Sequence, residues 1–382
     1  MINHKLHNQS WCNTTSSSQP PSTSLLERIR ALDRSKELKH NYTPMIFYHP
    51  DNGSTQQHYV AVGHVETSFI NSTLIHCKDE NDDPIFILDK MSNTNGIKTD
   101  VLRLKMDIQL QQQQQSASDT TQYIYDYRKL FQRRTIAFEH VTKHLLSCGV
   151  ISRKHTDMYP IYPFTKKKDD YEGNKKEILA HVNRNSAPYL GVDSVGVHLH
   201  CYVCEDTTAV CNKPTGIWLA KRAANKSHHP NLYDPAVAGG QPSNLSILEN
   251  IVKEAYEEAG VKAEWIYHNS KDSTFSDHTH DPLTITTAKS DGSCMKRSLY
   301  YSGDLLVPNN WVPTPVDGEV AEFKLYTMKE LEDELRYGNS VRPSMVAVLL
   351  DFMIRHEVLC IKSADNIKDL SDAMRRERMS LW

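Results

Sequence analysis

The chain has 382 residues, of which 39% are hydrophobic and 24% are charged, and its formal net charge at pH 7 is −3. This length predicts two or three domains, and the nearly balanced charge argues against a nucleic-acid partner held by electrostatics. No apolar run approaches the roughly 20 residues that cross a bilayer, so we expect no membrane segment.

Residues 1–23 are rich in Ser and Thr and lack the apolar centre of a secretory signal, which predicts a disordered tail. An organellar transit peptide is the alternative, but this segment holds one Lys and no Arg. The eight cysteines are spread along the whole chain, as is typical of a reduced protein. We therefore expect a cytoplasmic location.

The next part of the chain predicts a smaller α+β domain over residues 24–190. Apolar residues at helical spacing indicate a helix from about residue 25, and short apolar runs punctuated by Pro, Gly and Asn indicate strands. The strand candidates are 44–49, 58–65 and 84–90. A Gln-rich stretch at 107–122 predicts a low-complexity loop, and a helix is expected from about 125 to 147.

The second half predicts an α/β domain over residues 191–360, followed by a tail at 361–382. Residues 194–204 alternate between apolar and polar side chains, which predicts a half-buried strand with one polar face. Other strands are expected at 217–220, 235–238, 299–306 and 322–325. Helices are expected at 246–259, 328–337 and 343–357.

One predicted helix has clear signals at both of its ends. Ser246 and Glu249 have the spacing of a capping box, so the helix should begin after Ser246. Gly260 suits the left-handed conformation that ends many helices.

Three acids share one face of this helix. Glu254, Glu257 and Glu258 are spaced i, i+3 and i+4, and their mutual repulsion would be relieved by a hard divalent cation bound through oxygen. The alternative is an ordinary charged helix face. Gly239 and Gly240 precede the helix, and glycines at a strand end let the backbone approach a phosphate. The combination favours a metal and phosphate site.

Residues 239–261 resemble the Nudix box of the Nudix hydrolases. The run KEAYEEAGV at 253–261 matches the second half of the box, with Lys253 in place of Arg. In the first half, Leu245 stands where the early glutamate is expected, and Glu249 is the candidate to replace it. The runs GVHLHCYV, DPAVAGGQP and ENIVKEAYEEAGV further resemble the thiamine-pyrophosphokinase-related branch, which has an N-terminal domain of its own. This resemblance covers roughly residues 24–360.

The resemblance implies a fold, a reaction and a cofactor. The fold would be a Nudix α/β/α sandwich with a mixed sheet, preceded by a smaller α+β domain. Glu254, Glu257 and Glu258, with the backbone of Gly239, would hold Mg²⁺ or Mn²⁺, and either Glu254 or Glu258 would act as the base. The substrate would be a small-molecule diphosphate, above all a thiamine diphosphate derivative such as oxy- or oxothiamine diphosphate.

Other activities remain open at this point. One alternative substrate is 8-oxo-dGDP or another nucleoside diphosphate, and another alternative is a Nudix module that binds without catalysis. A kinase activity is not expected, because only a short segment follows residue 360. The sequence leaves the oligomeric state open.

Further candidates lie outside the box. Arg222 and Lys226 are candidates to pair with phosphate, and Gly240 is a candidate for close approach of the substrate. His198, on the expected polar face, is a candidate to contact a heteroaromatic ring, although a buried structural histidine is the alternative. Additional substrate-site candidates, placed by the resemblance, are Glu319 and Glu322.

Two further pairs of residues were considered as site candidates. Lys296 and Arg297 are lesser candidates for phosphate contact. Cys201 and Cys204 lie three positions apart on a predicted strand and should face opposite sides, so we do not expect them to bind one metal ion.

Overall fold

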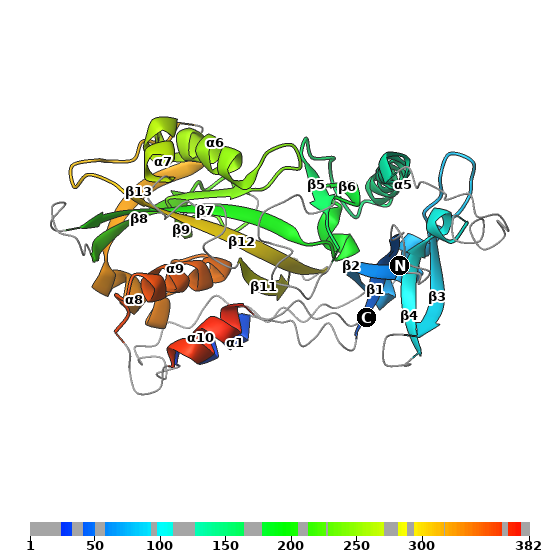
Figure 1. The fold of residues 1–382 in the computed structure, drawn as a ribbon, viewed down its shortest axis with the longest axis horizontal. Helices are drawn as coiled ribbons and strands as arrows, with labels where there is room; N and C mark the ends of the chain where they lie inside the picture. Colours follow the sequence, from blue (N-terminus) through cyan, green and yellow to red (C-terminus); the bar gives the residue numbers. More distant parts are fainter. Residues whose placement is uncertain are drawn as a thin grey trace, which may run out of the picture.

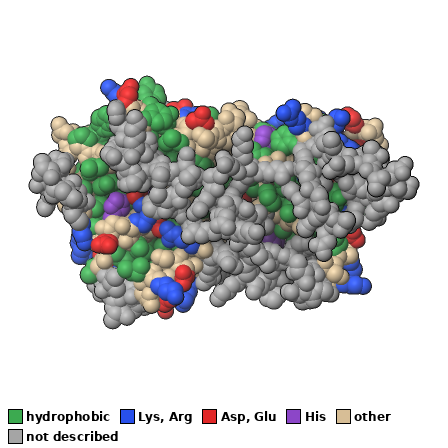
Figure 2. Space-filling model, viewed as in Figure 1, with side chains coloured by type: hydrophobic (Ala, Val, Ile, Leu, Met, Phe, Trp, Pro, Cys, Tyr) green, Lys and Arg blue, Asp and Glu red, His purple; other side chains and the backbone are tan. Residues whose placement is uncertain are grey.

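The computed structural model describes most of the chain in segments (Figure 1). These are residues 24–32, 41–49, 58–92, 98–109, 127–163, 178–204, 213–226, 228–270, 282–288, 294–316, 318–360 and 366–375. The expected disordered tail at 1–23 lies outside them. Among the described helices, none has both the length and the apolar character needed to cross a bilayer. Basic, acidic and hydrophobic side chains are interspersed on the face shown in Figure 2.

The first part of the chain builds a four-stranded sheet in the order β2-β1-β4-β3. Its strands are β1 (Tyr42–His49), β2 (His58–Glu66), β3 (Phe86–Ser92) and β4 (Lys98–Leu104). The long helix of this part is α5 (Tyr127–Ser147). The shorter elements are α3 (Thr67–Ser72), η2 (Leu74–His76), the pair β5 (Met158–Ile161) and β6 (Ala180–Asn183), and η4 (Ala187–Leu190). Phe47 and Phe86 from the sheet pack against Phe138 of α5 in one buried core.

The start of the expected loop at 107–122 is ordered and buried. Residues 105–109 form a helical turn, and 110–122 lie outside the described segments. Asp107 is 1% exposed and forms an ion pair with Arg134 of α5, with 2.9 Å between Oδ2 and Nη2. The backbone N–H of Tyr48 also donates to Asp107. The loop prediction is therefore wrong at its first residues, because this carboxylate joins β1 to α5.

The second part builds a larger mixed sheet in the order β11-β12-β7-β8-β13. Its strands are β7 (Ser194–Cys204), β8 (Pro214–Arg222), β9 (Tyr233–Pro235), β10 (Val237–Gly240), β11 (Leu283–Ala288), β12 (Met295–Leu306) and β13 (Val320–Thr327). Strands β12 and β7 are parallel, and the other pairs in this sheet are antiparallel. β10 extends the sheet beside β7, and β9 extends it beside β8. The single strand expected at 235–238 is thus two strands.

Helices cover both faces of this sheet (Figure 1). On one face lie α6 (Ile247–Ala259) and α7 (Ala263–Ser270), and on the other lie α1 (Leu25–Leu32), α8 (Met328–Tyr337), α9 (Pro343–Arg355) and α10 (Ile367–Met374). The two apolar cores are separate: Leu199 packs on the α6 side, whereas Tyr202 packs against Phe352 of α9. The expected α/β architecture with a mixed sheet between helical layers is confirmed.

Strand β7 differs from its prediction, because all its residues are buried. Alternation along the strand separates the two cores, since Cys201 lies on the α6 side and Cys204 on the α9 side. The expectation that these two cysteines face apart is confirmed. The expectation of a half-buried strand with an accessible polar face is wrong. The side that carries His198 and His200 is buried, because α9 covers it.

Both ends of the described chain pack on the second sheet. Leu25 and Ile29 of α1 belong to the same core as Leu370 and Met374 of α10. The sequence analysis placed residues 24–32 in the N-terminal α+β domain. In the structure they pack instead on the larger sheet of the second part. The segment at 361–382, expected to be a tail, contributes a packed helix.

Candidate functional site

The helix α6 begins and ends where its sequence predicts. The Ser246 hydroxyl accepts a hydrogen bond from the Glu249 N–H at 3.2 Å, and the Glu249 carboxylate accepts one from the Ser246 N–H at 2.7 Å. Gly260 ends the helix with φ 68°. Because its carboxylate belongs to the cap, Glu249 stabilises the start of the helix that carries the three candidate acids.

Glu258 is the most deeply buried of these acids. It is 6% exposed, and its Oε2 accepts the backbone N–H of Ala238 at 2.7 Å. Burial raises its pKa well above the usual value; the hydrogen bond from Ala238 opposes this rise, and the nearby charge of Glu254 adds to it. Its negative charge is thus poorly compensated by the described protein groups.

Glu254 lies directly against Gly239. A Cβ atom added to Gly239 would be 2.4 Å from the Glu254 carboxyl carbon, so only glycine allows this approach. Burial raises the pKa of Glu254, and the Lys253 ammonium, 3.2 Å from Oε1, opposes the rise. Glu257 is more exposed and lies 2.7 Å from the same lysine. Lys253 therefore forms ion pairs with two of the three acids, Glu254 and Glu257.

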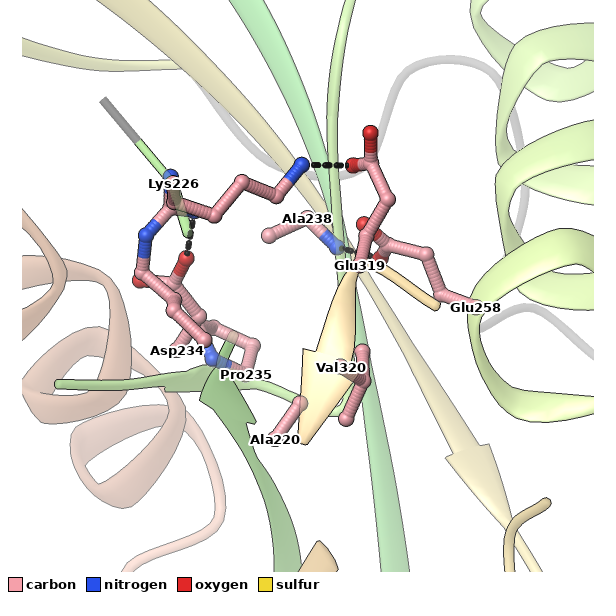
Figure 3. A pocket seen from close by; sticks show the side chains of 9 residues that line it. Ala220, Lys226, Asp234, Pro235, Ala238, Glu258, Glu319 and Val320 are labelled. Atoms are coloured by element: carbon pink, nitrogen blue, oxygen red, sulfur yellow. Dashed lines mark hydrogen bonds and ion pairs between the residues drawn. The ribbon is translucent and has the colours of Figure 1, made fainter. Parts of the chain in front are cut away.

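A pocket opens beside Glu258, at the end of the sheet (Figure 3). It is lined by Ala220, Arg222, Lys226, Asp234, Pro235, Ala238, Glu258, Glu319 and Val320, and we call it the Glu258 pocket. Lys226 and Glu319 form an ion pair across the opening, as Figure 3 shows. The fold thus brings four sequence candidates together: Arg222, Lys226, Glu258 and Glu319.

Two residues of this region were missed by the sequence analysis. Asp234 is 3% exposed, and its two oxygens bind Arg222 at 2.9 Å and Arg342 at 2.6 Å. The local signal for Asp234 was its place as the first residue of the run DPAVAGGQP at 234–242, which also contains the two glycines. Arg342 gave no local signal, since it lies 108 residues further along the chain.

Other candidates lie elsewhere. Glu322 is directed to Lys221, at 3.0 Å, and to the Tyr233 hydroxyl, at 2.9 Å, and does not line the Glu258 pocket. His198 is 2% exposed, and its ring centroid lies 5.1 Å from that of Tyr300. Arg297 forms a buried ion pair with Asp193.

The donor groups around Gly239 suit a hard divalent cation. Glu254 and Glu258 offer carboxylate oxygens, and the strand offers backbone carbonyls, which are the ligands that Mg²⁺ and Mn²⁺ prefer. The raised pKa values of both acids show that burial leaves their charge undercompensated. Within the described residues, no three His, Cys, Asp or Glu side chains already surround one point. The fit therefore rests on the kind of donor and on the uncompensated charge.

Comparison with known proteins gives distant relatives. No protein-family model matches the chain. It is 29% identical over 228 residues to "Nudix hydrolase 24, chloroplastic" of Arabidopsis thaliana, covering 60% of this chain and 56% of that protein. It is 29% identical over 223 residues to "Nudix hydrolase 20, chloroplastic" of the same plant, covering 58% and 53%. An uncharacterized protein of Saccharomyces cerevisiae, YJR142W, is 28% identical over 205 residues, covering 53% and 58%.

These matches span little more than half the length of each curated relative. Two of these relatives are named as Nudix hydrolases, the family whose box residues 239–261 resemble. By its sequence, the chain is distantly similar to two Nudix hydrolases, and its N-terminal region is built on the sheet β2-β1-β4-β3.

Proposed function

We propose that the chain is a metal-dependent pyrophosphohydrolase that cleaves a substituted diphosphate into its monophosphate and phosphate. The observation that carries the proposal is the Glu258 carboxylate, which is buried, undercompensated and placed in a pocket with the cations Lys226 and Arg222. Distant similarity to two Nudix hydrolases supports this class of reaction.

Each group around the pocket has a distinct part in this proposal. Glu254, Glu258 and the backbone of Gly239 would hold Mg²⁺ or Mn²⁺, with Glu257 as a further acid on the same helix. When bound, such a metal polarises phosphoryl oxygens and lowers the pKa of a water molecule. Either Glu254 or Glu258 would also take the proton of the attacking water.

The cations of the pocket would receive the phosphates. Lys226 offers a mobile point charge that must leave Glu319 to reach a ligand, whereas Asp234 fixes Arg222 in place. We expect Arg222 to set the local positive potential and Lys226 to contact phosphoryl oxygens directly. Glu319 is then released at the mouth of the pocket, where it is available as an additional acid.

For the substrate, we propose a thiamine diphosphate derivative, such as oxy- or oxothiamine diphosphate. The support is the run of motifs around the two glycines and α6 that resembles the thiamine-pyrophosphokinase-related branch. The competing substrate is 8-oxo-dGDP or another nucleoside diphosphate.

A substrate panel tests both levels of the proposal. Purified protein with Mg²⁺ should release phosphate from oxythiamine diphosphate faster than from 8-oxo-dGDP. The reverse order would replace the substrate but keep the reaction. If no diphosphate of the panel is cleaved with Mg²⁺ or Mn²⁺, the enzyme proposal is wrong and a binding module is the better account.

The compartment remains a separate prediction. The sequence predicts a cytoplasmic protein, whereas the names of two relatives place those proteins in the chloroplast. Imaging of the full chain with a C-terminal fluorescent tag distinguishes a diffuse cytosolic signal from an organellar one.

A further inference from the structure

The two glycines of β10 face opposite sides of the sheet. Gly239 faces Glu254 of α6, as described above. A Cβ atom added to Gly240 would lie 2.8 Å from the Tyr159 hydroxyl and 3.1 Å from both Cζ and Nη2 of Arg184. Tyr159 belongs to β5, and Arg184 directly follows β6, so both come from the N-terminal region. This region thus reaches the strand beside the candidate metal acids.

Arg184 is held in a defined position there. Its Nη1 lies 3.0 Å from Oδ2 of Asp157, and its guanidinium lies over the Tyr159 ring at 5.6 Å from the centroid. The Ser243 N–H donates to the Met158 carbonyl at 3.0 Å, which ties β5 to the segment after Gly240. Within the described part of the chain, Asp157 is the one carboxylate that pairs with Arg184. The guanidinium therefore has donors left for a ligand.

A second cation lies on the same face. In the sheet register, Gly240 pairs with Gly196, and Gly196 pairs with Tyr300. Lys296 lies on the Tyr300 side of β12, because residues four apart on a strand share a face. Its side-chain ammonium group has no hydrogen bond or ion pair among the described residues. Burial, followed by the charges of Arg342 and Arg184, lowers the pKa of Lys296 to about 8. Lys296 therefore lies near two other cations, Arg342 and Arg184, each of which is already paired with an acid.

We propose that Arg184 and Lys296 bind phosphoryl oxygens of the diphosphate substrate, so that the N-terminal region completes the substrate site. The acids would hold the metal on one side of the glycine strand, and these cations would hold phosphate on the other. A guanidinium suits this task because it can donate two parallel hydrogen bonds to a phosphate. The nature of the ligand rests on the proposed function, whereas the location rests on the contacts of Gly240.

Calorimetric titration with methylenediphosphonate, a diphosphate that is not hydrolysed, tests this in the presence of Mg²⁺. We expect Arg184→Gln and Lys296→Gln each to bind it about 10- to 100-fold more weakly than the wild type. Arg184→Lys should bind it more tightly than Arg184→Gln but less tightly than the wild type. Lysine keeps the positive charge but cannot donate the two parallel hydrogen bonds of the guanidinium. Arg133→Gln, which removes an exposed arginine of α5, is the matched control and should bind as the wild type does.

Equal affinity of Arg184→Gln and the wild type would overturn the proposal, as would a wild type that binds no methylenediphosphonate. Unfolding midpoints of all variants show whether a loss of affinity reflects misfolding, and Arg184→Lys keeps the test valid if Arg184→Gln is unstable. If the wild type cleaves diphosphates while Arg184→Gln keeps both its affinity and its KM, this inference fails and the proposed function stands. If Arg184→Gln weakens binding but no diphosphate is ever cleaved, the anion site stands and the proposed function fails.

Discussion

Two groups of charged side chains on the larger sheet differ in how completely their charges are paired. The Asp304 cluster links β7, β12, α9 and the end of α10. It consists of His200, Asp304, Asp351, Arg355, His356 and Arg375. The Glu258 pocket lies at the other side of the sheet, near α6.

In the Asp304 cluster the acids have several partners each. Asp304 binds His200 at 2.9 Å, His356 at 2.8 Å and both terminal nitrogens of Arg355. Burial opposes the ionisation of Asp304, but the hydrogen bonds from the two histidines and the charge of Arg355 together hold its pKa well below the usual value. Asp351 joins Arg355 to Arg375. The charges of this cluster are fully paired, and the cluster therefore has a structural role.

In the Glu258 pocket the balance is reversed. Glu258 is as buried as Asp304 but accepts one backbone hydrogen bond, and its pKa is raised. A buried acid with incomplete compensation costs stability, which supports the proposal that Glu258 binds a cation. The comparison teaches that completeness of pairing separates a structural cluster from a candidate site on the same sheet.

The largest expected effect is on the reaction rate of Glu258→Gln. Glutamine can still accept the Ala238 N–H, but it can neither act as a base nor bind a cation through a charge. We expect phosphate release from the best substrate of the panel to fall about 10,000-fold, equivalent to about 5.5 kcal/mol. The unfolding midpoint without metal should be equal to or higher than that of the wild type, because a buried uncompensated charge is removed. A rate within tenfold of the wild type would show that Glu258 has no catalytic role, and the Glu258 pocket would then not differ in function from the Asp304 cluster.

The complementary change is Asp304→Ala. It leaves Arg355 and two histidines without their shared carboxylate, which should lower the free energy of unfolding by about 3–5 kcal/mol. Urea denaturation measures this. Asp333→Ala, which breaks the exposed pair with Lys329, is the control and should change stability by less than about 1 kcal/mol. Similar losses in the free energy of unfolding for the two variants would show that the Asp304 cluster does not stabilise the fold more than an exposed ion pair does.

A third prediction concerns His64, at the junction between the two sheets. Burial, followed by the charge of Arg297, lowers its pKa from 6.5 to about 3, and Asp193 opposes this only in part. The unfolded chain therefore binds the extra proton between pH 6.5 and 3, so stability falls as the pH falls through that range. Between pH 7 and pH 5 the loss should be about 2 kcal/mol.

The matched variant for this prediction is His64→Gln, compared by urea denaturation at both pH values. Its stability should lose the part of the pH dependence that comes from His64. An unchanged slope between pH 7 and pH 5 would show that the imidazole is not held neutral by burial.

The smallest predicted effect is on the cap of α6. Ser246→Ala removes the side-chain acceptor of the Glu249 N–H and should lower the free energy of unfolding by about 1 kcal/mol. Thermal unfolding measures this, and Ser246→Thr, which keeps a hydroxyl, is the control. An effect equal to that of Asp304→Ala would mean that the cap contributes as much to stability as the buried pairing, which contradicts this ranking.

The features that sequence predicts well are those with local causes. The capping box at Ser246 has its partner three residues away, and its helix begins as expected. The helix expected at 328–337 also has its predicted bounds, and the structure shows that a capping box at Thr327 begins it. Features that depend on distant partners were missed: Asp107 pairs with Arg134, and Arg184 meets Gly240. The alternation of residues along β7 likewise predicted which side chains share a face. It did not predict that both faces are buried, because burial of the second face depends on packing against α9.

The same division applies to the candidate site. The acids of α6 share a face by helical geometry alone, whereas the burial that distinguishes Glu258 from Glu257 depends on how α6 packs beside β10. The cations are contributed by strand ends and loops far apart in the sequence. Their roles in binding therefore stay predictions until they are measured.

The most direct test of the account is Mn²⁺ binding, measured by calorimetry on the wild type, Glu258→Gln and Glu332→Gln. Glu332 is a matched acid, because it is 5% exposed and also accepts a backbone N–H, that of Cys360, but it is neutralised by Arg336 at 2.8 Å. The account predicts that the wild type and Glu332→Gln bind Mn²⁺ alike, and that Glu258→Gln binds it at least about tenfold more weakly. Equal Mn²⁺ affinity of Glu258→Gln and the wild type would contradict it.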